Sequence, residues 1–238
     1  MRVGVFIDGQ NVTIGARYAF GRHDGANGTG NMHPLLLGRA LAGECDLVEI
    51  RYATGIPNPD VDREKWEAER RRHDLMAATD VVVLEKQLRY RWQWDIRNER
   101  ELGDPRDHKG DTVDAKAKSR NIGQEKGIDV WLALDALTMC TRADIDKVII
   151  ATADTDLDMV PHHLRMMPGH DETIVAQAKV LGGGREVYQN DAYDETMAID
   201  ETIFEQSRDD FDYRSSIDEN EIADFVTRIG AHEDGIRD

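Results

Sequence analysis

Short runs of β-branched and other apolar residues alternate along this chain with longer segments of helical character. The runs predicted as strands are Arg2–Ile7, Leu47–Tyr52, Val81–Leu84, Lys147–Thr152 and Thr173–Ala176, with Glu186–Tyr188 as an edge strand. The segments predicted as helices are His33–Leu41, Asp62–Ala78, Ala115–Gln124, Val130–Cys140, Thr155–Met166 and Asp194–Phe204. Strands that alternate with helices are typical of an α/β fold, with a mostly parallel central sheet and helices on both faces.

Two stretches do not follow this alternation. Gly21–Asn31 is rich in Gly and Asn, which is typical of a flexible loop. Residues 89–108 scatter Trp, Gly and Pro among charged residues, and we expect a long excursion from the sheet there. The chain is therefore predicted to hold one domain over residues 1–206, followed by an acidic C-terminal appendage over residues 207–238.

Composition narrows the class of protein. Of the 238 residues, 40% are hydrophobic and 32% are charged, which suits a folded domain with a core. No apolar run is long enough for a membrane span, and Cys45 and Cys140 have no metal-binding spacing. We therefore expect no membrane association and a cytoplasmic location, where thiols stay reduced.

The net charge of −17 at first argues against a nucleic-acid partner, because Lys and Arg supply the affinity for phosphate. The charge is uneven, however. Val61–Lys126 holds 16 Lys and Arg against 15 Asp and Glu, whereas Asp191–Asp238 holds 4 against 16. Most of the excess acid thus lies near the C-terminus, so the total does not decide the partner. The appendage also has apolar residues on one helical face that could dock elsewhere, namely Ile222, Phe225, Val226 and Ile229.

Two of the predicted strands end in carboxylates. The first leads into Asp8 and Asn11, and the second leads into Asp154, Asp156 and Asp158. Because ligands of parallel α/β sheets bind at the carboxyl ends of strands, both groups are directed to one edge. Hard oxygen ligands with no His or Cys nearby suit Mg²⁺ or Mn²⁺. The alternative for any single Asp is a helix cap or a turn, and Asp158 is equally well explained as a solvated helix residue.

Two further carboxylates belong to the predicted helix Val130–Cys140. Asp129 precedes this helix, where its side chain can either cap the helix or join the metal site. Asp135 lies in an apolar stretch, so it needs a bonding partner or faces the site. A bonded, structural acid is the favoured interpretation of Asp135, and a supporting role around the metal is the alternative.

Three of these segments, taken in order, resemble the motifs of NYN-domain nucleases, a branch of the PIN-like superfamily. Phe6–Asn11 resembles their opening motif, and Lys126–Leu137 resembles the second motif of the LabA-type bacterial branch. Ala151–Leu157 is similar to the third motif, which usually reads Ser-Gly-Asp-Ser-Asp-Phe. This chain has Thr and Ala at the Ser-Gly positions and Leu at the Phe position, which affects details more than chemistry. The similarity covers roughly Met1–Phe204.

The resemblance implies a fold and an activity. The fold would be a PIN-like, Rossmannoid three-layer sandwich, and the activity would be metal-dependent endoribonuclease cleavage of RNA. The residues implied to hold Mg²⁺ or Mn²⁺ are Asp8, Asp129, Asp154 and Asp156. Asn11 is implied to orient a carboxylate or to contact phosphate.

Basic and aromatic residues are candidates for holding the nucleic acid. Within residues 89–97, cations alternate with rings, which suits the phosphates and stacked bases of a single strand. The alternative is a hairpin whose rings pack on the body of the protein, and charged residues on a helix are usually only solvated. The candidates are Arg70, Arg71, Arg89, Arg91, Trp94 and Lys126.

Other functions compete with RNA hydrolysis. The same motifs would also serve a nuclease acting on single-stranded DNA, and a phosphatase for small esters would use similar acids in a closed pocket. A protein of a different class would keep the fold for regulation or interaction, with the acidic appendage binding a partner protein or a second copy. Salt bridges that fill the acidic site would favour this binding protein, whereas carboxylates clustered in an open cleft would favour the enzyme.

Overall fold

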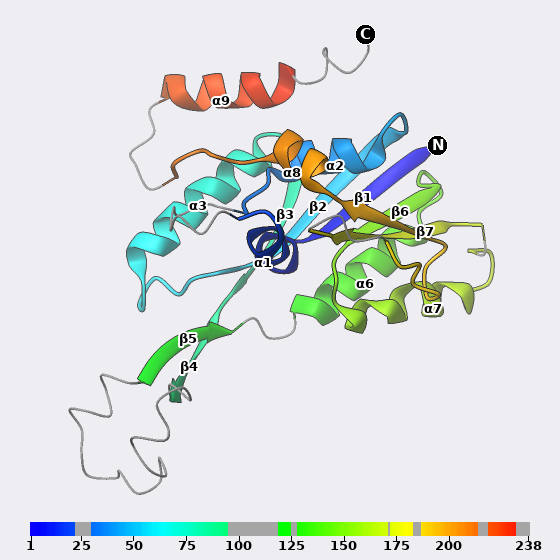
Figure 1. Ribbon diagram of the computed structural model, residues 1–238, viewed down its shortest axis with the longest axis horizontal. Helices are drawn as coiled ribbons and strands as arrows, with labels where there is room; N and C mark the ends of the chain where they lie inside the picture. Colours follow the sequence, from blue (N-terminus) through cyan, green and yellow to red (C-terminus); the bar gives the residue numbers. More distant parts are fainter. Residues whose placement is uncertain are drawn as a thin grey trace, which may run out of the picture.

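A six-stranded, all-parallel sheet forms the centre of the molecule in the order β3-β2-β1-β6-β7-β8 (Figure 1). The computed structural model describes residues 1–21, 30–94, 119–124, 128–170, 172–182, 187–213 and 219–231. The strands of this sheet are β1 (Arg2–Asp8), β2 (Asp46–Ile56), β3 (Val81–Gln87), β6 (Lys147–Ala151), β7 (Ile174–Val180) and β8 (Glu195–Ile199). The predicted α/β fold with a mostly parallel sheet is confirmed.

Helices cover both faces of the sheet, as in a three-layer sandwich (Figure 1). One face packs against α1 (Gly9–Ala19), α2 (Pro34–Ala42), α3 (Arg63–Ala77) and α8 (Glu201–Ser207). The other packs against α6 (Ile128–Cys140), the 3-10 turn η2 (Thr155–Asp158) and α7 (Met159–Arg165). In the part of the chain that the structure describes, no helix is both long and apolar enough to cross a membrane.

Strand β1 is apolar on both sides because both of its faces are covered. Val3, Val5 and Ile7 are buried in the core shared with α1 and α2, while Phe6 is buried in the core shared with α6 and α7. At Gly4 an added Cβ would lie 2.2 Å from Met139 Sδ of α6. The glycine therefore allows α6 to pack close against the sheet.

The strand order reverses between β1 and β6. From β1 the sheet continues to β2 and β3 on one side, and from β6 it continues to β7 and β8 on the other. Crossovers leave the two neighbouring strands toward opposite sides, and the crevice outside their carboxyl ends is where ligands bind in open α/β sheets. Asp8 ends β1 and Ala151 ends β6, so both acidic motifs follow directly at this point.

Helix α1 begins at Gly9, directly after β1, although a glycine at the end of a strand usually indicates a turn. Asp8 caps the helix by accepting a hydrogen bond from the Asn11 amide. A Cβ on Gly9 would lie 2.4 Å from Cζ of Tyr52, so this glycine is required by packing against the Tyr52 ring. A glycine that suggests a turn in the sequence is here the first residue of a helix.

Two of the helix predictions were wrong because strand pairing overrides local preference. Ser119–Gln124, the end of the predicted helix Ala115–Gln124, is strand β5, which pairs antiparallel with β4 (Arg89–Trp94). The predicted helix Asp194–Phe204 begins instead as edge strand β8, and α8 starts only after Asp200. The edge strand expected at Glu186–Tyr188 is therefore replaced by β8, and its described residues 187 and 188 form no strand.

Several predictions concern segments outside the described residues. These segments include most of the loop Gly21–Asn31, residues 95–108 of the excursion, the start of the predicted helix Ala115–Gln124, and residues 214–218 and 232–238 of the appendage. Strand β4, which begins the excursion, pairs with β5, and the two strands extend from the end of β3, away from the sheet (Figure 1).

The described part of the C-terminal appendage packs on the body of the protein. Helix α9 (Glu219–Ala231) buries Phe225 and Ile229 in a small core with Leu36 of α2 and Leu75 of α3. Tyr213 belongs to the same core, and its hydroxyl donates to the buried Asp209 carboxylate at 2.9 Å. The predicted apolar stripe of the appendage is thus a docking face for the chain's own α2 and α3.

Candidate active site at the ends of β1 and β6

Asp8 lies at the end of β1, beside the end of β6, with its carboxylate held in place. Asp8 is 8% exposed. Oδ1 accepts from the Asn11 amide at 3.0 Å, and Oδ2 accepts from the Thr152 hydroxyl at 3.1 Å. The first bond comes from α1 and the second from the end of β6, so Asp8 is fixed by both elements that flank the crevice.

Thr152 and Asn11 join the two acidic motifs. The Thr152 Oγ1 that donates to Asp8 also accepts from the Asp154 amide at 3.1 Å. Asn11 Oδ1 accepts from the Ala153 amide at 2.8 Å, which ties α1 to the segment after β6. Asp8 and the segment that holds Asp154 are therefore linked at one edge in two ways, through the Thr152 hydroxyl and through Asn11.

The acids of the second motif lie on and beside η2. Asp154 caps this turn, because its Oδ1 accepts from the Asp156 amide at 3.0 Å. Asp156 is exposed, and Asp158 is partly exposed. Within the described ranges, none of Asp154, Asp156 and Asp158 forms an ion pair with a Lys or Arg side chain.

Asp129 completes the set that the sequence predicted, and its backbone lies in the first turn of α6. Its side chain is not among those that the structure describes. Among the side chains that are described, no three His, Cys, Asp or Glu residues are close enough together to hold one metal ion. The structure thus brings Asp8, Asp154 and Asp156 to one edge, and the place of the Asp129 carboxylate stays a prediction.

This geometry agrees with a comparison against known families. The model of the NYN domain matches residues 2–181. The chain belongs to the NYN domain family. NYN domains are part of the PIN-like superfamily of nucleases, so the family predicted from the three motifs is confirmed.

The fold of this NYN domain also occurs in a solved structure. It is similar to the crystal structure of a protein of unknown function from Vibrio parahaemolyticus, with a TM-score of 0.50 and 18% sequence identity. The similarity covers 84% of this chain and 93% of the Vibrio protein. At this identity the likeness shows a shared fold alone. The comparison with curated proteins found no match.

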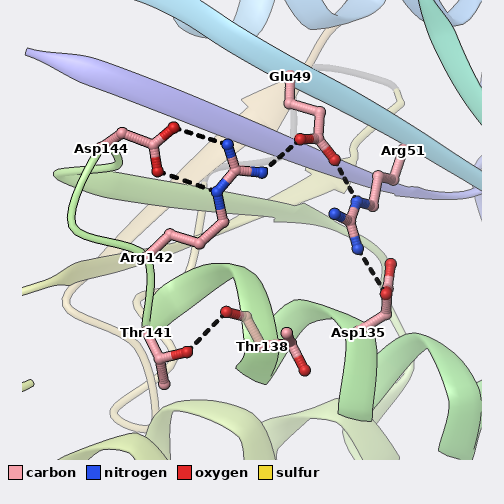
Figure 2. A network of polar contacts seen from close by, with 7 residues as sticks. All are labelled: Glu49, Arg51, Asp135, Thr138, Thr141, Arg142 and Asp144. Atoms are coloured by element: carbon pink, nitrogen blue, oxygen red, sulfur yellow. Dashed lines mark hydrogen bonds and ion pairs between the residues drawn. The ribbon is translucent and has the colours of Figure 1, made fainter.

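Asp135, which the sequence left between a structural and a supporting role, belongs to an ion-pair network away from the strand ends. Figure 2 shows a chain of alternating charges that joins α6 to β2. Asp135 Oδ1 lies 2.5 Å from Arg51 Nη1, and Arg51 also bonds Glu49. Arg142 bonds the other oxygen of Glu49 and then Asp144, so each acid in the network faces a guanidinium.

The network changes the acid–base properties of its members. Burial acts to raise the pKa of Glu49, but hydrogen bonds from Arg51 and Arg142 outweigh it and leave the pKa lowered. Burial acts to lower the pKa of Arg51, whereas its bonds to Asp135 and Glu49 raise it overall. These groups stay charged and mutually neutralised near neutral pH, which is typical of a structural clamp.

The basic residues proposed for nucleic-acid contact are placed differently. Arg70 Nη1 donates to both oxygens of Glu85 at 2.9 and 3.0 Å, and Arg71 Nε donates to the Tyr213 carbonyl at 2.8 Å. Both side chains therefore have protein partners, Arg70 in β3 and Arg71 in the C-terminal appendage. For Arg89, Arg91 and Trp94 the structure describes the backbone of β4, and Lys126 falls outside the described residues. Their contacts with nucleic acid stay predictions.

Sequence reasoning missed several polar residues of this edge. Thr152 links Asp8 to Asp154, yet in the sequence it is one more β-branched residue at the end of a strand. Asn190 donates to Asp158, but it comes from a segment with no recognisable motif. The only available signal was the position of Thr152 between a strand and an acidic motif.

Proposed function

We propose that this NYN domain is a metal-dependent endoribonuclease that hydrolyses RNA phosphodiester bonds. The proposed ligands of Mg²⁺ or Mn²⁺ are Asp8, Asp129, Asp154 and Asp156, with Asn11 as a positioning residue. The observation that carries the proposal is the shared Thr152 hydroxyl, which bonds Asp8 and the Asp154 amide where β1 meets β6. An NYN domain with both acidic motifs joined in this way supports a nuclease.

The donors at this edge fit a hard divalent cation. The described side chains offer carboxylate, hydroxyl and amide oxygens, which are the ligands that Mg²⁺ and Mn²⁺ prefer. The hydrogen bonds of Asp8 and Asp154 fix the planes of the two carboxylates. Three carboxylates of one turn without a Lys or Arg partner in the described ranges give a negative field that a cation would relieve.

Hydrogen bonds within the chain hold the carboxylates of the site in position. A cation bound here supplies activation of water and neutralisation of the leaving oxygen. Thr152 holds Asp8 and Asp154 at a set spacing, and Asn11 holds α1 against the segment after β6. These bonds mean that the acids need little rearrangement when a ligand arrives, and such preorganisation favours catalysis.

The choice of substrate rests on the family more than on the described contacts. RNA is proposed because the motifs are those of NYN nucleases, and single-stranded DNA is the competing substrate. We propose that the strand pair β4–β5, which carries Arg89, Arg91 and Trp94, binds the nucleic acid. Arg70 and Arg71 are less suitable, because both already have protein partners. We place the activity in the cytoplasm on the ground that Cys45 and Cys140 are free thiols.

A cleavage assay with matched variants tests this proposal. The purified full chain is incubated with end-labelled RNA and with DNA of the same sequence, with Mn²⁺, with Mg²⁺ or with EDTA. We expect internal cuts in RNA that require the cation and are lost in Asp154→Asn. Asp191→Asn is the control, because it removes one carboxylate charge at an exposed position outside the proposed ligand set. Cleavage of DNA alone would change the substrate, and cleavage that persists in EDTA would contradict the metal site.

Absence of cleavage in this assay would support the alternative, in which the protein serves regulation or interaction. A protein that cuts no nucleic acid with either cation, and that keeps its secondary structure by circular dichroism, would favour regulation or binding. The packing of α9 on α2 and α3 argues against the apolar face of the appendage as a binding site for a partner, since Phe225 and Ile229 are already buried. A second copy or another protein would have to use other residues of the appendage.

A further inference from the structure

A loop beyond the matched family region reaches the acidic edge. The NYN match ends at residue 181, whereas residues 187–194 lie between β7 and β8 and contact the end of η2. In this loop Asn190 is partly exposed, and Tyr193 is buried with an exposed fraction of 3%. Both residues face Asp158, the acid that follows Asp154 and Asp156 by one further step of the motif.

Asn190 holds the Asp158 carboxylate. Its Nδ2 donates to Asp158 Oδ1 at 3.1 Å and to Gln177 Oε1 at 3.0 Å. Because an amide nitrogen has two protons, Asn190 can satisfy both acceptors at once. Asp158 is therefore a bonded acid with a defined direction, and this excludes the interpretation of a residue that is only solvated.

The sheet in turn holds Asn190. Gln177 is a fully buried residue of β7, and Thr196 lies opposite it on β8. The Asn190 amide donates to Thr196 Oγ1 at 3.1 Å, while Asn190 Oδ1 accepts from the Ala192 amide at 3.1 Å. The donor side of Asn190 thus points to Asp158, and its acceptor side shapes the loop.

Tyr193 adds a buried hydroxyl beside the same acids. Its Oη is buried and forms no hydrogen bond of regular geometry with any described residue. Asp158 and Asp154 lie near this hydroxyl, and Asp158 is within its reach as a hydrogen-bond acceptor. The hydroxyl is thus a donor directed at the acidic edge, where it can help to hold Asp158.

We propose that Asn190 and Tyr193 are positioning residues that hold Asp158 beside Asp154 as an additional acid of the site. The inference rests on the proposed function, and it extends the site by a loop outside residues 2–181. Asp158 then adds negative charge to the place where the cation is proposed to bind. Loss of Asn190 or of Asp158 would weaken cation binding through one shared path.

Binding of Mn²⁺ to the full chain, measured by titration calorimetry, tests this path without relying on activity. Partners that orient metal ligands contribute about 10- to 100-fold to affinity. We expect Asp158→Asn and Asn190→Ser each to weaken Mn²⁺ binding by roughly 10-fold. Serine keeps an acceptor for the Ala192 amide, so the turn is retained, but its side chain is too short to reach Asp158 and Gln177 together. Tyr193→Phe, which removes only the hydroxyl, should weaken binding by a smaller factor.

The double variant separates positioning from a merely structural role. If Asn190 acts through Asp158, Asp158→Asn combined with Asn190→Ser should bind Mn²⁺ no more weakly than Asp158→Asn alone. Losses that multiply in the double variant would overturn the inference, as would parental affinity in Asn190→Ser. Asp191→Asn, next to Asn190 and exposed, is the matched control and should bind as the parent does.

The outcomes for this inference and for the proposed function are distinguishable. If Asp154→Asn loses Mn²⁺ binding and cleavage while the Asn190 and Asp158 variants equal the parent, only the inference fails. If Asp154→Asn also equals the parent, or if the parent binds no Mn²⁺, the metal-dependent nuclease fails and takes the inference with it. Melting temperatures of all variants, compared with the parent, show whether a loss reflects unfolding.

Discussion

Two acidic regions of this domain differ in the groups that hold their carboxylates. At the ends of β1 and β6, Asp8 and Asp154 are held by amides and a hydroxyl. Between α6 and β2, Asp135 and Glu49 are each held by guanidinium groups (Figure 2). The first arrangement fixes direction and leaves negative charge to attract a cation. The second removes the charge and clamps a helix to a strand.

The difference shows that the partner of an acid tells more than its presence in a motif. Asp129 and Asp135 lie on the same helix, and the apolar surroundings of Asp135 left a structural role and a supporting role at the site as alternatives. The Arg51 partner of Asp135 comes from β2, a strand at the other side of β1 from β6. Substitutions in the two regions should therefore affect different properties, cleavage in the first and stability in the second.

The largest expected effect is on cleavage by Asp154→Asn. Asparagine caps a turn as well as aspartate does, so the fold should be retained. The charge for the cation is lost, and removal of electrostatic stabilisation of this kind costs about 2.7–4 kcal/mol, or roughly 100- to 1,000-fold in rate. Single-turnover cleavage of labelled RNA measures the rate, and the unfolding midpoint in urea measures stability. A variant that cuts at the parental rate would remove the contrast between the two regions.

A loss of stability far from both regions is the next largest effect. Phe225 of α9 is 3% exposed, and its ring lies 4.8 Å from that of Phe211. Phe225→Ala should lower the free energy of unfolding by about 3 kcal/mol, since buried Phe to Ala changes cost ~3–5 kcal/mol. Cleavage at 25 °C should stay near the parental rate if the remaining stability suffices. The matched control is Thr227→Ala, at an exposed position of the same helix, which should unfold at the parental urea concentration.

This result also bears on truncation after Gln206, which removes the whole acidic appendage. Asp209 and Tyr213 are buried, and Arg72 of α3 lies 3.6 Å from Asp209. Removal of the appendage would expose Leu36 and Leu75 and leave the Arg72 guanidinium without this carboxylate. We expect the truncated chain to unfold at a lower urea concentration than the parent. Truncation is therefore a poor test of how the charge of the appendage affects cleavage.

Asp135→Asn should give the opposite pattern to Asp154→Asn. The side chains of Arg51 and Asp135 are each 18% exposed, so the pair is partly screened and worth less than a fully buried one. We expect a loss of about 1–2 kcal/mol in unfolding free energy, below the ~3–5 kcal/mol of a buried pair. Mn²⁺ affinity should remain that of the parent. A large loss of Mn²⁺ affinity without a loss of stability would return Asp135 to the site.

The effect that is smallest near neutral pH concerns His33, which belongs to neither region. Burial, followed by Arg72, Arg39 and Arg228, lowers the pKa of His33 to about 3. Since the unfolded pKa is near 6.5, the unfolded chain binds more protons below it, and stability is lost as pH falls from about 6.5 toward 3. His33→Asn keeps an acceptor for the Leu35 amide and should flatten this loss by up to ~1.4 kcal/mol per pH unit. Urea unfolding at several pH values checks it, with the exposed His162→Asn as control; equal slopes for parent and His33→Asn would contradict it.

The sequence predicted the parts of the molecule that depend on local pattern. Buried β-branched runs revealed the central strands, and the acids after Ile7 and Ala153 revealed the edge where the motifs meet. It did not predict β5 or β8, because strand pairing with β4 and β7 decides those segments. Nor did it predict that Asn190 would reach Asp158, since this contact depends on the path of a loop between two strands.

The most direct test of the central claim compares Mn²⁺ affinity in Asp154→Asn and Asp135→Asn. Both changes remove one carboxylate charge and keep the size of the side chain, so they differ only in which acidic region they alter. We predict that Asp154→Asn binds Mn²⁺ at least about 10-fold more weakly at parental stability, whereas Asp135→Asn binds as the parent does and unfolds more easily. Equal affinities in the two variants, or weaker binding in Asp135→Asn alone, would contradict the assignment of the metal site to the ends of β1 and β6.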